Sequence, residues 1–297
     1  MSDTMSPEAA AERIGETLNR MKADGGHLEN ILEAFRGLLV EQARLKAEFP
    51  AEAFVKIDVS DRERFGKRAP LACREKLISI GEMWKMGAER LIPPIKEGFP
   101  KIREVLERLQ SAITIGNFDP DVYAAEALED INQGALETAA ESAPEQGTMK
   151  FALIHISRPF MAKRAETLKP FMDGLLWERG YCPVCGSLPE LSILREKEGL
   201  LWLRCGFCRH EWRFMRMACP CCETQEQGNA EVLFIEEREH ERLDLCLHCR
   251  KYVAEIDLRA AVKEPAPDIA GLGLLRLDVL AQQKGFQPMG VIWWSVL

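Results

Sequence analysis

Eight of the ten cysteines stand in four Cys-x-x-Cys pairs, a spacing at which a tight turn directs two thiolates toward one metal ion. The pairs are Cys182/Cys185, Cys205/Cys208, Cys219/Cys222 and Cys246/Cys249. Two such turns complete a tetrahedral shell of four thiolates, and closed shells of this kind hold zinc or iron. The sequence therefore predicts two complete metal sites, with all eight of these cysteines as ligands.

The pairs also form a tandem repeat. Each unit opens with Cys-Pro-x-Cys and closes with Cys-x-x-Cys-Arg. A strand-like run precedes each closing pair, at 200–204 and 242–245, and an aromatic segment follows it. This pattern is typical of two rubredoxin-like or zinc-ribbon modules, which we place at residues 179–216 and 217–262.

Two other uses of paired cysteines fit the chain less well. Disulfide frameworks belong to secreted proteins, and residues 1–5 have neither the basic region nor the apolar stretch of a secretory signal. No run of eighteen apolar residues occurs, so we expect a cytoplasmic protein without membrane insertion. A thioredoxin-like activity would need one motif in a βαβ context rather than four in series.

The excess of acidic over basic residues makes nucleic acid a less favoured partner. The chain of 297 residues has a net charge of -8. Between residues 179 and 259 there are 12 Lys or Arg against 14 Asp or Glu, before any charge from thiolates is added. A phosphate-binding surface needs a basic face. Arginines beside the knuckles could still form a local patch, so a zinc-ribbon module that binds nucleic acid stays an alternative.

Residues 1–178 contain a single cysteine and are predicted to form an all-helical domain. Ser6-Pro7-Glu8 is a helix start signal, because proline and an acidic residue are favoured in the first turn. The residues that follow predict further helices over 31–45, 77–88, 102–109, 119–143 and 151–177. We expect Pro93-Pro94 to end the third helix, and we expect the sixth to be kinked or broken around Pro159 and Pro170. The polar stretch between Pro50 and Pro70 is predicted to be a loop.

Beyond residue 178 the pattern changes to short strands, including 191–194 and 231–235, separated by turns. A β-rich region of this size has a small core, and two metal sites would supply the missing stability. Residues 263–297 should add a helix, capped by Asp268, and an apolar tail at 289–294 that docks on the fold. The fold class expected is α+β.

Few other residues suggest chemistry. The sequence has no P-loop, Rossmann glycine pattern, nucleophile elbow or His-Glu-x-x-His motif, so we expect no enzyme activity. His210 and His248 adjoin knuckles and should lie at the surface or behind the ligands, because four cysteines already close each shell. Cys73 should be a buried apolar residue. Cys221 makes the third knuckle Cys-Pro-Cys-Cys, and the two-residue spacer favours Cys222 as its ligand.

Several of these motifs together resemble the formate dehydrogenase accessory (formation) protein family, FdhE-like. They are the Tyr-Cys-Pro-Val-Cys-Gly knuckle at 181–186, the Leu-Arg-Cys-x-x-Cys pair at 203–208, the Cys-Pro-x-Cys pair at 219–222, the Cys-Leu-His-Cys-Arg-Lys-Tyr pair at 246–252 and Leu-Asp-x-x-Ala at 277–281. The resemblance extends over roughly residues 178–290.

The resemblance implies an assembly factor rather than a catalyst. Members are cytoplasmic, contact the catalytic subunit of respiratory formate dehydrogenases during its maturation, and bind iron through rubredoxin-like motifs. It therefore favours iron over zinc in both sites, although spacing alone leaves the two metals open. A rubredoxin-like one-electron carrier remains a second possible function, since four-thiolate iron can cycle between ferrous and ferric states.

Overall fold

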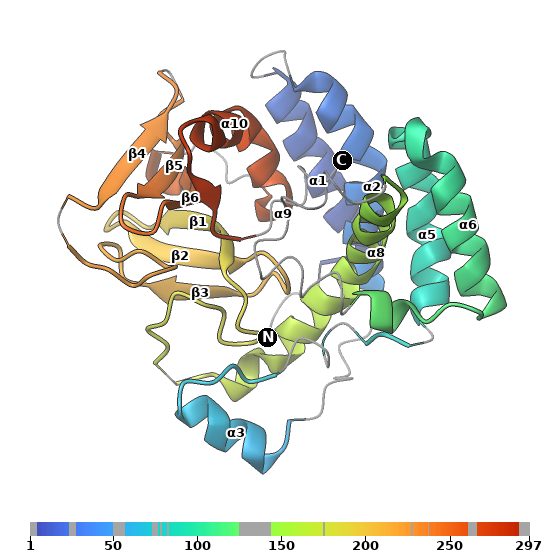
Figure 1. The fold of residues 1–297 in the computed structure, drawn as a ribbon, viewed down its shortest axis with the longest axis horizontal. Helices are drawn as coiled ribbons and strands as arrows, with labels where there is room; N and C mark the ends of the chain where they lie inside the picture. The colour runs from blue at the N-terminus through green and yellow to red at the C-terminus, as the bar shows by residue number, and fades with distance from the viewer. Residues whose placement is uncertain are drawn as a thin grey trace. The chain divides into compact units, whose positions relative to one another are not determined.

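The computed structural model describes residues 5–23, 28–49, 57–72, 77, 79–81, 83–124, 144–174, 176–226, 228–236, 238–260 and 266–290. They form two compact units: a helical unit drawn from 1–52 and 74–164, and a sheet unit drawn from 53–73 and 165–292 (Figure 1). A helical N-terminal region is followed by a sheet-containing region that carries two four-cysteine groups, which confirms the predicted α+β class. The limits predicted at residues 178, 216 and 262 stay predictions.

The long helices of the helical unit include four that are amphipathic and a last one that is buried on all sides over residues 151–162. They are α1 (Pro7–Ala23), α2 (Glu29–Glu48), α5 (Met83–Gly98), α6 (Arg103–Ile115) and α8 (Pro144–Leu168). Ser6 accepts a hydrogen bond from the Ala9 N–H in the first turn of α1, as its start signal predicts. Gly116 ends α6 with a φ of 80°, a left-handed conformation in which glycine is favoured.

Three prolines predicted to end, kink or break helices lie inside helices. α5 continues through Pro93-Pro94, and α8 passes Pro159 and ends at Leu168, before a 3-10 turn over Lys169–Phe171. Tertiary packing outweighs the lost backbone hydrogen bond in α5, where Leu91, Ile92 and Ile95 are fully buried. α8 ends at Leu168, close to the break predicted around Pro170.

The loop predicted between Pro50 and Pro70 contains a short helix, α3 (Val59–Gly66), and so that prediction is wrong. A capping box explains it: the Asp58 carboxylate accepts from the Asp61 N–H at 2.9 Å, and the Asp61 carboxylate accepts from the Asp58 N–H at 3.3 Å. These reciprocal bonds satisfy backbone donors that otherwise have no partner at a helix start. The polar composition of this stretch had been interpreted as a loop, and the capping box was not recognised in the sequence.

Some predictions fall outside the described residues. Of the helix predicted over 119–143, residues 120–124 are helical and those from 125 onward lie outside the description. Cys73 also lies outside it, as does the tail from residue 291. Met289, at the start of the tail, is buried.

The four strands predicted from sequence belong to one seven-stranded sheet. The sheet consists of β1 (Pro189–Arg195), β2 (Leu200–Cys205), β3 (Glu211–Phe214), β4 (Ala230–Phe234), β5 (Glu241–Cys246), β6 (Lys251–Asp257) and β7 (Gln287–Pro288). Three of these strands, β3, β6 and β7, were not predicted from the sequence. The order is β3-β2-β1-β6-β5-β4, with β7 beside β6. Each sequence repeat thus becomes three antiparallel strands with a knuckle before the first and another between the second and third. A parallel β1–β6 ladder joins the two repeats (Figure 1).

One face of this sheet packs on the C-terminal helices. Leu191, Ile193, Leu243 and Ile256 share a buried cluster with α10 (Leu275–Gln283) and the 3-10 turn Gly271–Leu274. The expected C-terminal helix is interrupted, because α9 (Pro267–Ala270) and this turn precede α10. Asp268 does not cap it, since Ala266 is the N-cap residue and the Asp268 carboxylate pairs with Arg204.

Glycines in the helical unit give a matched test of this packing. A Cβ on Gly98 of α5 would overlap the carbonyl oxygen of Ala34 in α2, whereas a Cβ on Gly15 of α1 would meet nothing within 4 Å. We expect Gly98→Ala to lower the free energy of unfolding by about 1–3 kcal/mol through overpacking. Gly15→Ala should raise it by about 0.5–1 kcal/mol through helix propensity. Urea unfolding followed by circular dichroism measures both, and equal effects would contradict the α2–α5 packing.

Candidate metal centre

The four knuckles share one backbone turn. In three of them the residue after the second cysteine donates its N–H to the carbonyl of the first cysteine, at 2.8–2.9 Å. In all four that residue is left-handed; these residues are Gly186, Arg209, Glu223 and Arg250, with φ between 56° and 77°. Only the first is glycine. The other three hold a conformation that is unfavourable for their side chains, so the surrounding structure must enforce the turn.

The first cysteine group comprises Cys182, Cys185, Cys205 and Cys208, which come from the knuckle before β1 and the knuckle between β2 and β3. Its sulfurs lie within 4.8 Å of one another, with Cys182 and Cys208 at 3.6 Å and Cys185 and Cys205 at 3.4 Å. All four residues are buried. The Cys205 sulfur accepts backbone N–H bonds from Phe207 at 3.3 Å and Cys208 at 3.4 Å.

The second cysteine group has the same arrangement in more open surroundings. Cys219, Cys222, Cys246 and Cys249 also have their sulfurs within 4.8 Å, but only Cys246 is fully buried. The distance is 3.8 Å from Cys219 to Cys249 and 3.7 Å from Cys222 to Cys246. The structure thus brings together the eight predicted cysteines as two sets of four.

The donor chemistry suits a divalent metal. Burial raises the pKa of the Cys182 and Cys208 thiols well above their usual value, and burial raises the pKa of Cys219 to about 12. Four buried thiolates without a cation would carry an uncompensated charge, so the ligand form needs the positive charge of an ion. Each group could hold a metal ion, and both zinc and iron accept four thiolates.

A segment distant in sequence covers the first knuckle. The N–H groups of Leu71 and Ala72 donate to the carbonyls of Pro183 and Val184 at 2.8 and 2.9 Å. The Tyr181 hydroxyl donates to the Arg68 carbonyl at 2.8 Å. Residues 57–72 therefore belong to the first cysteine group's surroundings, although their sequence indicated only a polar loop. No local motif signals this contact.

A second set of contacts links the two groups. The Glu223 carboxylate accepts from the Gly180 N–H at 3.2 Å and pairs with Arg179 at 2.7 Å. Gly180 packs so closely on the Pro220 carbonyl that a Cβ there would overlap it. Glu223 occupies the position that Gly186 has in the first knuckle. Its side chain links the third knuckle to residues 179–180, which directly precede the first knuckle. Sequence reasoning missed this role, because Arg179 and Glu223 are 44 residues apart.

Arginines near the first cysteine group are engaged by carboxylates. Arg204 is buried and pairs with Glu211 at 2.8 Å and with Asp268, and Arg209 is buried and pairs with Glu190. Their charges are therefore balanced inside the protein. Arg250, beside the fourth knuckle, is exposed, and its guanidinium lies 3.9 Å from the centre of the Phe286 ring. Arg204 and Arg209 thus contribute no exposed basic surface.

The remaining singled-out residues lie outside the two groups. His210 is partly buried, and burial lowers its pKa to about 4, so that its ring is neutral near pH 7. His248 is exposed. Cys221 is partly buried and packs beside the second group, while Cys222 contributes the sulfur that faces the other three.

Comparison with known proteins gives consistent matches. The family model FdhE, central domain, matches residues 181–216, which hold the first cysteine group. A protein FdhE homolog of Aquifex aeolicus is 27% identical over 194 residues, or 64% of this chain and 62% of that protein. One of Pectobacterium atrosepticum is 35% identical over 38% of this chain and 37% of its own length. The chain thus matches less than two thirds of the length of these relatives.

The fold has a solved counterpart. The crystal structure of the FdhE protein from Pseudomonas aeruginosa superposes with a TM-score of 0.71 at 21% identity, covering 96% of this chain and 95% of that one. No described helix has both the length and the apolar character needed to cross a bilayer. The resemblance to the FdhE family of formate dehydrogenase accessory proteins is thereby confirmed, in sequence at the central domain and in fold over nearly the whole chain.

Proposed function

We propose that each cysteine group binds one metal ion through its four sulfurs, with iron favoured and zinc the alternative. The ligands are Cys182, Cys185, Cys205 and Cys208 in the first site, and Cys219, Cys222, Cys246 and Cys249 in the second. The close approach of four sulfurs within 4.8 Å supports this proposal. The backbone N–H bonds to the Cys205 sulfur and its buried setting suit a rubredoxin-type iron site. The preference for iron rests on the family resemblance.

The different burial of the two groups predicts an order of metal loss. Protein purified without oxygen should contain two metal ions per chain and no inorganic sulfide. A chelator should remove the ion of the second group first, because three of its cysteines are partly exposed while all four in the first group are buried. Elemental analysis during incubation with EDTA measures the order. A single ion per chain, or simultaneous loss of both, would contradict the assignment.

Serine substitutions separate the ligands from the spare thiol. Cys182→Ser and Cys246→Ser should each lose one ion, because folding of a thiolate module is coupled to metal binding. Cys221→Ser, one residue from a proposed ligand, should keep both ions.

Limited proteolysis adds a structural readout for the same variants. Cys182→Ser should open residues 57–72 to protease, since Leu71 and Ala72 bind the knuckle that unfolds. Cys246→Ser should leave that segment protected. Retention of two ions and full protease resistance by both variants would show that these cysteines are not ligands.

We propose that the protein is a cytoplasmic, non-catalytic maturation factor that binds the catalytic subunit of a respiratory formate dehydrogenase during its assembly. The match of residues 181–216 to the FdhE central domain carries this proposal. The relatives and the solved structure named FdhE support it.

The other functions have weaker support. The partly exposed cysteine residues of the second group favour one-electron transfer as a second candidate, because an exchanging centre must lie near the surface. For the nucleic-acid alternative, Arg204 and Arg209 are already paired with carboxylates, which removes two cations from any phosphate-binding surface.

The assembly role predicts a separation of enzyme level from enzyme activity. Deletion of the gene should lower formate-dependent dye reduction in cells while leaving the catalytic polypeptide detectable by immunoblot. Affinity-tagged protein should retrieve that subunit from wild-type cells. Mature, purified formate dehydrogenase should turn over formate equally well with and without the protein. Unchanged formate oxidation in the deletion strain, together with no retrieved subunit, would falsify the role and favour the electron carrier.

A further inference from the structure

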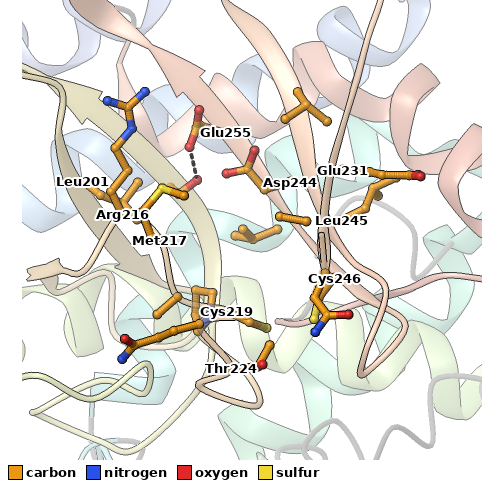
Figure 2. Close-up of a pocket in the computed structure, with 18 of the residues that line it drawn as sticks. Leu201, Arg216, Met217, Cys219, Thr224, Glu231, Asp244, Leu245, Cys246 and Glu255 are labelled. Carbon is orange, nitrogen blue, oxygen red and sulfur yellow. Dashed lines mark hydrogen bonds between the residues drawn. The ribbon is translucent and has the colours of Figure 1, made fainter. Parts of the chain in front are cut away.

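The second cysteine group borders a cavity of about 380 Å³ within the sheet unit (Figure 2). Cavity residues on β6, such as Val253, alternate with residues of the buried cluster, so the cavity lies on the sheet face opposite the C-terminal helices. Figure 2 shows Cys219, Thr224 and Cys246 together at one end of it. The first group is instead buried and covered by residues 57–72. An ion in the second group can therefore exchange while the first group stays covered.

The third knuckle is shaped by the ligands that it carries. The Glu223 N–H donates to the Cys219 carbonyl at 2.8 Å, and the Cys219 N–H donates to the Thr224 carbonyl at 3.0 Å. These bonds close the turn and hold Glu223 at a φ of 56°, which is unfavourable for a residue with a side chain. An ion that binds Cys219 and Cys222 fixes the two ends of this turn and so offsets its strain. Loss of the ion removes that constraint.

The closed turn directs the Glu223 carboxylate at the residues before the first knuckle. It accepts from the Gly180 N–H at 3.2 Å and pairs with Arg179 at 2.7 Å. The Arg179 carbonyl in turn accepts from the indole N–H of Trp212, on β3, at 3.1 Å. Arg179 is thus bonded both to the module of the second group and to that of the first.

A backbone contact acts at the same place. Gly180 packs directly on the Pro220 carbonyl, where a Cβ would overlap it. Opening of the third knuckle would therefore displace two groups that contact Gly180, the Pro220 carbonyl and the Glu223 carboxylate. Cys182 lies two residues further along, and its N–H closes the first knuckle by donating to the Ser187 carbonyl at 2.9 Å. A change in the third knuckle thus acts close to a ligand of the first group.

We propose that the two metal sites are energetically coupled through Glu223, so that an ion in the second group raises the affinity of the first group for its own ion. This proposal rests on the assignment of one ion to each group under the proposed function above. The coupling is reciprocal, because two binding equilibria that share one conformational change must shift each other by the same factor. The accessible second group then sets how firmly the buried first group holds its ion.

Cadmium enriched in its NMR-active isotope tests the coupling, because it accepts the same four thiolates and each occupied group has its own signal. The affinity of each group is measured in the full-length protein by competition with EDTA at equilibrium. Cys249→Ser removes the second ion without altering residues 219–223, and it should lower the affinity of the first group about fivefold or more. Cys208→Ser, which disables the first group, should lower the affinity of the second group by the same factor.

Substitutions of Glu223 separate the link from the turn. Glu223→Gly should bind the second ion at least as tightly as the original protein, because glycine adopts the left-handed turn without strain. It removes the carboxylate contacts, so in its background Cys249→Ser should lose most of its effect on the first group, as a double-mutant cycle measures. Glu226→Gly is the matched control: this exposed carboxylate bonds to Asn229 in the same segment, and its loss should leave the coupling intact.

The outcomes distinguish the coupling from the metal assignment on which it rests. If the protein binds two cadmium ions but Cys249→Ser leaves the affinity of the first group unchanged, the two groups are independent and the proposal is overturned, while the metal sites stand. If Glu223→Gly preserves the full effect of Cys249→Ser, the coupling does not pass through Glu223 and the proposal is likewise overturned. If Cys249→Ser and Cys208→Ser both keep two ions, the metal assignment itself fails and the coupling fails with it.

Discussion

The parallel pairing of β1 with β6 is the interaction on which the sheet unit depends. Leu191 to Leu194 pair with Ala254 to Asp257 and join two three-stranded modules into one sheet. Each module alone has too few strands to bury a substantial core. Together they present one apolar face to the C-terminal helices, and the opposite face holds the cavity. The core, the spacing of the cysteine groups and the cavity all follow from this one ladder.

Identical ligand sets can stand in different surroundings. The first cysteine group is buried beneath residues 57–72, and the carboxylate partners of Arg204 and Arg209 balance the charges near it. The second group has three partly exposed cysteines and borders a cavity. Burial favours a rigid, protected centre, whereas exposure permits exchange and contact with a partner. The sequence repeat therefore does not make the two modules equivalent.

Glu223 shows how one residue serves backbone and side chain at once. Its left-handed φ of 56° closes the third knuckle, at a position where glycine would be less strained. Its carboxylate binds Gly180 and Arg179, which lead into the first knuckle. A glycine at this position would form the turn but would remove the link. The strain in the turn is thus offset by contacts between the two modules.

The sequence by itself determined the features that neighbouring residues control. The cysteine pairs, the strands that follow the knuckles and the amphipathic helices depend on local spacing, and the fold class was predictable from them. The same local rules failed at Pro93-Pro94, where packing kept a helix intact, and at residues 59–66, where an Asp58–Asp61 capping box formed one.

Only the tertiary structure decided which distant segments meet. Three contacts join residues that are tens of positions or more apart in the sequence. They are the packing of residues 57–72 over the first knuckle, the Arg179–Glu223 link and the β1–β6 ladder. Arg242 of β5 likewise has its partners, Glu255 and Asp257, on the next strand of the sheet. Such contacts follow from the register between strands and from the packing of the whole unit, and no local spacing in the sequence encodes them.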